Sequence, residues 1–191
     1  MKLLEQRILQ DGIVKEGNIL KVDSFLNHQI DVKLMNELGK EVKRLFGHKN
    51  ITKILTIEAS GIAAATIIAQ YFDVPVLFAK KAKSQNLDGD LFTSVVRSYT
   101  YGKDYTITVS KKFLSEEDHV LIIDDFLAVG SAMKGLIDVC NQAGATIEGI
   151  SIMVEKGFQE GGKYLREAGY DLQSMAIIEK MEGTTITFRE E

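Results

Sequence analysis

The stretch Val120–Ala132, VLIIDDFLAVGSA, decides the fold of this chain. Its first four residues are apolar and three of them are β-branched, a pattern that predicts a strand buried on both faces of a sheet. Two carboxylates, Asp124 and Asp125, follow at the expected end of that strand. Because open α/β sheets bind ligands beyond the carboxyl ends of their strands, this pair is the first candidate for a binding site.

A run of small residues follows the carboxylates and leads into a helical pattern: Ala128, Val129, Gly130, Ser131 and Ala132. Free backbone N–H groups at a helix N-terminus suit a phosphate. Two carboxylates beside such a loop would repel a simple anion, so a sugar phosphate fits better, with its hydroxyls toward the acids. The spacing leaves a second interpretation open, in which the acids are solvated and Ser131 only caps the helix.

Composition bounds the class of protein. The chain has 191 residues, is 45% hydrophobic, and carries a net charge of -4 with a pI near 5.5. This length supports one domain over residues 1–191, and the acidic balance gives no reason to expect nucleic acid as a partner. The single cysteine, Cys140, excludes an intramolecular disulfide. No signal-peptide core or membrane-length apolar run is found, so we expect a soluble, cytoplasmic protein without a membrane partner.

Helical and strand patterns alternate along the sequence. The predicted helices cover residues 34–46, 61–72, 133–140 and 160–168, and the predicted strands cover 51–57, 74–79, 120–123, 146–154 and 171–178. This alternation predicts an α/β fold with a doubly wound, mostly parallel sheet. A polar, basic stretch and a predicted hairpin interrupt the alternation between residues 80 and 113. The three histidines share no metal-ligand spacing, so no metal site made by protein ligands is expected.

The whole string Val120–Ala132 resembles the signature of the type I phosphoribosyltransferases, and the resemblance spans nearly the whole chain. It implies a five-stranded parallel sheet, a small hood from residues 1–30 and the C-terminal region, and a flexible lid at about 80–113. The two acids would hold the ribose hydroxyls, and residues 128–132 would cradle the 5′-phosphate. Threonines are common in the family at the positions of Val129 and Ala132, so phosphate binding must depend here on backbone N–H groups and Ser131.

The resemblance also implies a site for the pyrophosphate leaving group. Its loop would be Glu58, Ala59, Ser60 and Gly61, with a non-proline cis peptide between Ala59 and Ser60. Taken alone, this segment is equally an ordinary helix start with Ser60 as its cap.

Two lysines of the lid, Lys80 and Lys81, would neutralise the pyrophosphate, with Lys81 taking part in catalysis; a solvated basic loop is the alternative. The lid also resembles the flexible loop of adenine phosphoribosyltransferases, but neither Tyr99 nor Tyr101 is assigned a role. Mg²⁺ would be held mainly by the substrate phosphates.

The base would be recognised by two segments. In the first, Leu20 would pack on the base or offer backbone groups to it, and Asn27 would supply an amide; alternatively Asn27 caps the following helix. In the second, Lys156 would donate to the 6-oxo group of an oxopurine while Phe158 covers the ring. Adenine carries an amino group at this position, so a cationic donor disfavours it.

The resemblance therefore implies an enzyme of purine salvage. It would transfer the phosphoribosyl group of 5-phosphoribosyl 1-diphosphate to N9 of xanthine, giving xanthosine 5′-monophosphate and pyrophosphate, and would act as a homodimer. One alternative is a transferase for guanine and hypoxanthine, or for adenine. Another is a transcriptional regulator that senses the same sugar diphosphate, although no segment of DNA-binding length precedes the expected hood.

Overall fold

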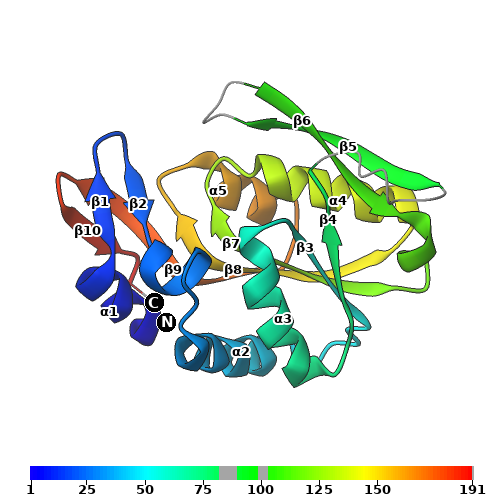
Figure 1. Cartoon of the computed structure of the whole chain (residues 1–191), viewed down its shortest axis with the longest axis horizontal. Helices are drawn as coiled ribbons and strands as arrows, with labels where there is room; N and C mark the ends of the chain where they lie inside the picture. The colour runs from blue at the N-terminus through cyan, green and yellow to red at the C-terminus, as the bar shows by residue number, and fades with distance from the viewer. Residues whose placement is uncertain (82–89, 99–102, 191) are drawn as a thin grey trace.

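A six-stranded sheet forms the centre of the computed structural model, which describes residues 1–81, 90–98 and 103–190 (Figure 1). The strand order is β10-β9-β8-β7-β3-β4. The strands β4, β3, β7, β8 and β9 run parallel, and β10 pairs antiparallel with β9. The predicted parallel sheet is thus confirmed, with one antiparallel edge strand added. Its strands are β3 (Lys53–Ile57), β4 (Val76–Ala79), β7 (His119–Leu127), β8 (Thr146–Lys156), β9 (Leu172–Glu182) and β10 (Thr185–Phe188).

Alternate residues of the central strand β7 enter two separate cores, as the period of a strand requires. Leu121 and Ile123 pack in the core under α2 and α3, whereas Val120 and Ile122 pack under α4. Helices therefore cover both faces of the sheet (Figure 1). No helix of the described residues is long and apolar enough to span a membrane. The helices are α1 (Lys2–Asp11), α2 (Val32–Phe46), α3 (Ser60–Phe72), α4 (Ser131–Ala143) and α5 (Glu160–Glu167).

The strands β7, β8 and β9 extend further than predicted, and the extension of β7 changes where the acids lie. β7 continues to Leu127, so Asp124 and Asp125 lie inside the strand and are only 5% and 6% exposed. The prediction that they stand where the strand ends is wrong, because the pairing with β8 continues beyond them to Leu127. The alternative in which the acids are solvated is wrong as well, because both are buried. β8 likewise continues to Lys156, which therefore lies at the end of this strand rather than after it.

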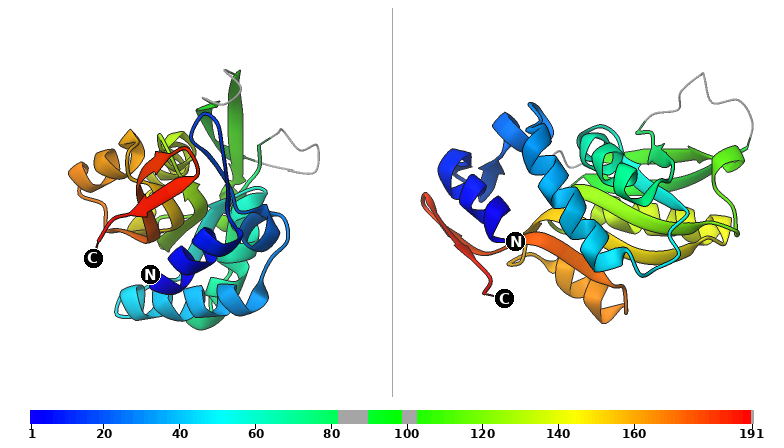
Figure 2. Two further views of the ribbon diagram at one scale, coloured as in Figure 1. Left: turned by 90° about the vertical axis from the view of Figure 1, so that its left-hand side faces the viewer. Right: turned by 90° about the horizontal axis from the view of Figure 1, so that it is seen from below.

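The N-terminal segment packs beside the C-terminal strands. It contains α1, the hairpin β1 (Ile13–Lys15) and β2 (Ile19–Lys21), and the short helical turn η1 (Asp23–Asn27). The β1–β2 hairpin lies next to the turn between β9 and β10, and one surface hollow is lined by both (Figure 2). The cap of α2 is Asp31, whose side chain accepts from two backbone N–H groups. The alternative in which Asn27 caps this helix is therefore wrong.

The predicted hairpin is present as β5 (Leu91–Ser98) and β6 (Lys103–Ser110), followed by the turn η2 (Lys111–Phe113). It projects from the sheet and packs on α4 (Figure 1). The contact is close because Gly135 of α4 has no side chain: a Cβ there would lie 2.5 Å from Cγ2 of Val96. Tyr99 and Tyr101, considered above, lie outside the described residues.

Candidate functional site

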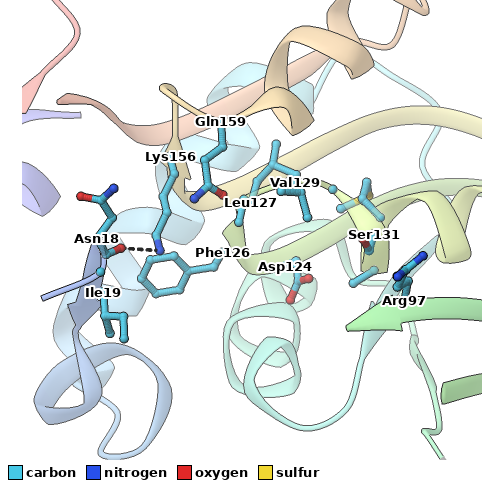
Figure 3. A pocket seen from close by; sticks show the side chains of 15 residues that line it. Asn18, Ile19, Arg97, Asp124, Phe126, Leu127, Val129, Ser131, Lys156 and Gln159 are labelled. Carbon is cyan, nitrogen blue, oxygen red and sulfur yellow. Dashed lines mark hydrogen bonds between the residues drawn. The ribbon is translucent and has the colours of Figure 1, made fainter. Parts of the chain in front are cut away.

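A cavity of about 470 Å³ opens beyond the carboxyl ends of β7 and β8, where the topology of the sheet predicts a ligand (Figure 3). One wall is the loop that joins β7 to α4. The hood hairpin supplies a second wall, and β8 and the β5–β6 hairpin supply the rest. Its lining includes Asn18, Ile19, Arg97, Asp124, Phe126, Ala128, Val129, Gly130, Ser131, Ala132, Lys156 and Gln159.

The two adjacent acids of β7 have different partners. Oδ1 of Asp125 accepts from the Ser60 hydroxyl at 3.0 Å, and its Oδ2 accepts from Nδ2 of Asn27 at 2.8 Å. Asp124 lines the cavity, and its Oδ1 accepts from the backbone N–H of Asp125 at 2.9 Å. Burial, and then the charge of Asp125, raise the pKa of Asp124 well above its ordinary value. Asp124 is thus a carboxyl group that is costly to ionise and faces the ligand space.

The predicted pyrophosphate loop lies between β3 and α3, directly against the acids. A Cβ at Gly61 would lie 2.2 Å from Oγ1 of Thr56 and 2.9 Å from Oδ1 of Asp124, so only glycine lets α3 begin this close to β7. The cis peptide joins Glu58 to Ala59, one bond before the predicted Ala59–Ser60. The earlier position follows from the helix: Ala59 already has helical backbone angles as the residue before α3, and an α-helix is built from trans peptides.

The loop Ala128–Ala132, which forms the first wall of the cavity, leads into the N-terminus of α4. Gly130 has a φ of 82°, in the left-handed region that favours glycine. The helix begins at Ser131, so the N-cap is Gly130 and not Ser131 as the alternative interpretation had it. Among the described residues no side-chain hydrogen bond caps α4, so its first-turn N–H groups and the Ser131 hydroxyl can bind an anion from the cavity side.

Lys156 crosses the cavity from the end of β8. Its Nζ donates to the backbone carbonyl of Asn18 in the hood at 3.0 Å (Figure 3). Burial lowers the pKa of this lysine. A half-buried ammonium with further N–H groups to donate thus lies across the cavity from a loop suited to phosphate. The cavity can therefore bind a ligand that offers an acceptor atom to Lys156 and an anionic group to the loop Ala128–Ala132.

Two hydrophobic residues predicted to contact the base are placed differently. The side chain of Leu20 is buried in the core under α2 and α3, and its neighbour Ile19 lines the cavity, because adjacent residues of a strand face opposite ways. Phe158 is 37% exposed and lies outside the cavity lining, whereas Phe126 of β7 lines it (Figure 3). Phe126 was missed, although its signal was available as an aromatic residue directly after the acid pair.

The two predicted lid lysines diverge. Lys80 forms a backbone bridge with Thr108, and it lines a second cavity at the β4 edge of the sheet instead of the one described here. Lys81 lies on the acid side: its backbone N–H donates to Glu58, its ammonium lies 5.6 Å from the ring centroid of Tyr105, and its charge slightly lowers the pKa of Asp124. Residues 82–89, which follow Lys81 in the predicted lid, lie outside the described residues.

Arg97 of β5 was also missed. Its side chain lines the cavity beside Ser131, opposite Lys156 (Figure 3). The only signal in the sequence was a basic residue within an alternating hairpin. Within residues 1–81, 90–98 and 103–190, no group of three or more His, Cys, Asp or Glu side chains forms a metal site.

Comparisons with known proteins agree with this geometry. The model of the phosphoribosyl transferase domain matches residues 21–182. The xanthine phosphoribosyltransferase of Ruminiclostridium cellulolyticum is 62% identical, and the alignment covers 100% of both chains. The xanthine phosphoribosyltransferase of Lachnoclostridium phytofermentans is 60% identical over 99% of this chain and 98% of its own.

A solved structure shows the same fold. The adenine phosphoribosyltransferase of Rhodothermus marinus superposes with a TM-score of 0.75 at 21% identity, over 93% of this chain and 100% of the other. The domain match and the full-length relatives together show the family that the sequence signature indicated: this chain belongs to the phosphoribosyltransferases.

Proposed function

We propose that this chain transfers the phosphoribosyl group of 5-phosphoribosyl 1-diphosphate to N9 of xanthine, giving xanthosine 5′-monophosphate and pyrophosphate. The observation that carries the proposal is the position of Lys156, which shares one cavity with the phosphate loop and Asp124. The full-length relatives above bear the name of the same activity. A donor for the base and a cradle for the sugar phosphate therefore lie at opposite ends of one site.

The sugar diphosphate would bind along the loop and the acids. Backbone N–H groups of Ala128–Ala132 and the Ser131 hydroxyl would hold the 5′-phosphate. Asp124 and Asp125 would accept from the ribose hydroxyls, since each carboxylate oxygen retains acceptor capacity beyond the bonds it makes in the protein. The segment Glu58–Gly61 and Lys81 border the acids and would face the pyrophosphate. A pyrophosphate contact from Lys80 is less well supported, because Lys80 lines the second cavity.

The base would lie between the hood and the end of β8. Lys156 would donate to the 6-oxo group of the base. Phe126 would supply an aromatic contact to the ring and Ile19 an aliphatic one. A carboxylate only accepts, so Asn27 directs its NH₂ at Asp125 and keeps one N–H and its carbonyl oxygen for the base. The sequence-based role of Phe158 requires it to turn inward over the ring.

A magnesium ion fits this donor set in one way. Two carboxylates next to a phosphate loop, with no cluster of three ligands among the described residues, suit a Mg²⁺ held mainly by substrate phosphates and water. When bound, the ion would neutralise the charge of the departing pyrophosphate. The side chains that could share it are Asp124 and Asp125.

The reaction breaks the bond from C1′ to the pyrophosphate oxygen, forms the bond from C1′ to N9, and releases the N9 proton. The protein contributes position and electrostatics. The carboxylates would stabilise a ribose with positive charge at C1′, and Lys81 would neutralise the charge that the pyrophosphate gains. No side chain is required as a nucleophile.

The direct experiment is pyrophosphate release with a panel of bases, followed by chromatography of the nucleotide product. We expect release with xanthine and formation of xanthosine 5′-monophosphate. Release only with adenine would contradict the proposal and favour another branch of the family. Light scattering of the purified chain tests the proposed homodimer.

Arg97→Ala is expected to raise the KM for the sugar diphosphate about 10- to 100-fold, because one hydrogen bond to a charged group is worth about 1.5–3 kcal/mol. The guanidinium lines the cavity beside Ser131, on the far side from Lys156, so the KM for the base should change little. Lys111→Ala in the turn that follows the hairpin is the control, since Lys111 instead pairs with the exposed Asp90. Equal KM values in wild type and Arg97→Ala would remove Arg97 from the site.

The role of residues 80–113 as a lid remains a prediction, and limited proteolysis tests it. Cleavage between Lys80 and Phe113 should be slowed by the sugar diphosphate with Mg²⁺, because a closed segment is protected. Protection that is the same with and without the ligand would argue against a lid.

A further inference from the structure

The side chain next to Lys156 on β8 is a buried carboxylate. Glu155 is 1% exposed and accepts from both terminal nitrogens of Arg166, at 2.7 and 2.8 Å, and from the Ser174 hydroxyl. Burial raises the pKa of Glu155, but its bonds to Arg166 and Ser174 outweigh burial, and the pKa lies below its ordinary value. Glu155 is therefore ionised, and it joins β8 to the last turn of α5.

The first turn of α5 lies against this ion pair without any side chain between. A Cβ at Gly162 would lie 1.9 Å from Oε1 of Glu155 and 2.7 Å from NH1 of Arg166. The pair thus fixes the backbone of the helix and not only its surface. Since Arg166 follows Gly162 by one helical turn, the same short helix is held at two points.

Gly161, the residue before Gly162, lies against the phosphate loop Ala128–Ala132. Its backbone N–H donates to the carbonyl of Ala128 at 3.0 Å. A Cβ at Gly161 would lie 2.4 Å from that carbonyl oxygen and 2.9 Å from the backbone nitrogen of Gly130. The start of α5 therefore supports the loop by direct contact between two backbones, at a residue that is not part of the cavity lining.

We propose that the Glu155–Arg166 ion pair and Gly161 act as positioning residues, which hold the loop Ala128–Ala132 at a fixed place relative to Lys156. The inference rests on the proposed function, because it assigns the loop to the phosphate of the sugar diphosphate. One strand then sets both ends of the substrate site: Lys156 directly, and the phosphate loop through Glu155, Arg166 and α5. The Glu155 carboxylate of this pair is only 1% exposed and must be desolvated, whereas the Arg166 side chain is 36% exposed to solvent. Such a pair adds little net stability, so we assign its contribution here to geometry.

Binding of 5-phosphoribosyl 1-diphosphate with Mg²⁺, measured by calorimetry, tests the inference without depending on the base. Gly161→Ala would push the loop toward the ligand, and we expect about 10- to 100-fold weaker binding, as for other displacements of about 1 Å in a site. The KM for the base at saturating sugar diphosphate should change less than about threefold. Gly39→Ala is the matched control: it adds a Cβ 2.5 Å from the Tyr71 ring, between α2 and α3.

A second variant keeps the inference testable if Gly161→Ala does not fold. Glu155→Gln with Arg166→Met removes both charges together, so no unpaired charge is left buried. We expect an unchanged or higher Tm with several-fold weaker binding of the sugar diphosphate. Wild-type binding in this variant, or in a folded Gly161→Ala, overturns the positioning role alone. A wild-type chain that binds no sugar diphosphate overturns the proposed function and this inference with it.

Discussion

Asp124→Asn is expected to lower kcat about 100- to 1,000-fold and, at the same time, to raise the Tm at neutral pH. The activity should fall because an amide replaces the carboxyl group that would hold the ribose and stabilise positive charge at C1′, and such a group at the reacting centre is usually worth that much. The stability should rise because the Asp124 carboxyl is buried beside Asp125, and its pKa is raised well above the ordinary value. Asparagine keeps an oxygen for the N–H of Asp125 and needs no ionisation.

The stability difference between Asp124→Asn and wild type should also depend on pH, in a direction that the raised pKa of Asp124 determines. In wild type, the folded state holds the Asp124 proton at pH values where the unfolded chain, with a pKa near 3.8, has lost it. The free energy of unfolding therefore falls as the pH rises from that value through the raised pKa. Asp124→Asn lacks this fall. The Tm difference between variant and wild type should be small in acid and should grow as the pH rises.

Two comparisons sharpen the test. Asp125→Ala leaves the donors of Ser60 and Asn27 without their acceptor, and we expect a loss of about 1–3 kcal/mol in stability together with a loss of activity. Asp138→Asn, at an exposed site on α4, should change neither quantity. An Asp124→Asn variant with wild-type kcat would contradict the role of the acid pair.

The sequence predicted the order of elements better than the direction of individual side chains. The run of β-branched residues in β7, the small-residue loop and the acid pair are local signals, and they predicted the sheet correctly and pointed to a loop that lines the cavity. The burial of Asp124 and Asp125 could not be read from the sequence, because it depends on how far β8 pairs with β7. Arg97 was missed for the same kind of reason: it reaches the cavity only because the hairpin packs on α4.

In two places the sequence prediction named a residue or bond next to the one that the structure shows. Leu20 and Ile19 differ by one position on a strand, so a small error of register exchanges the core residue for the cavity residue. The cis peptide at Glu58–Ala59 shows the same error at a helix start. Gly161 and Gly162 carried no visible signal, since their role appears only once α5 lies against the phosphate loop.

Lys156→Ala is expected to lower kcat/KM for xanthine about 10- to 100-fold, since a hydrogen bond from a charged group contributes about 1.5–3 kcal/mol. A protonated lysine only donates, so it favours an acceptor at purine position 6 and disfavours the amino group of adenine. At position 2, the amide of Asn27 can meet the oxygen of xanthine or the amino group of guanine, whereas hypoxanthine leaves it unpaired. Xanthine also ionises near neutral pH, and a nearby ammonium favours the anion. We therefore expect the order xanthine, guanine, hypoxanthine, with adenine essentially unused.

The measurement is kcat/KM for the four bases in wild type, Lys156→Ala and Lys156→Met, which retains most of the length of the side chain without its charge. Both variants should lose oxopurine turnover while binding the sugar diphosphate like wild type, because the phosphate loop lies across the cavity from Lys156. Since burial lowers the pKa of Lys156, the advantage of xanthine should also be lost at a lower alkaline pH than an exposed lysine would give. Adenine turning over as fast as xanthine, or full activity in Lys156→Ala, would refute the base assignment and leave the phosphoribosyl chemistry standing.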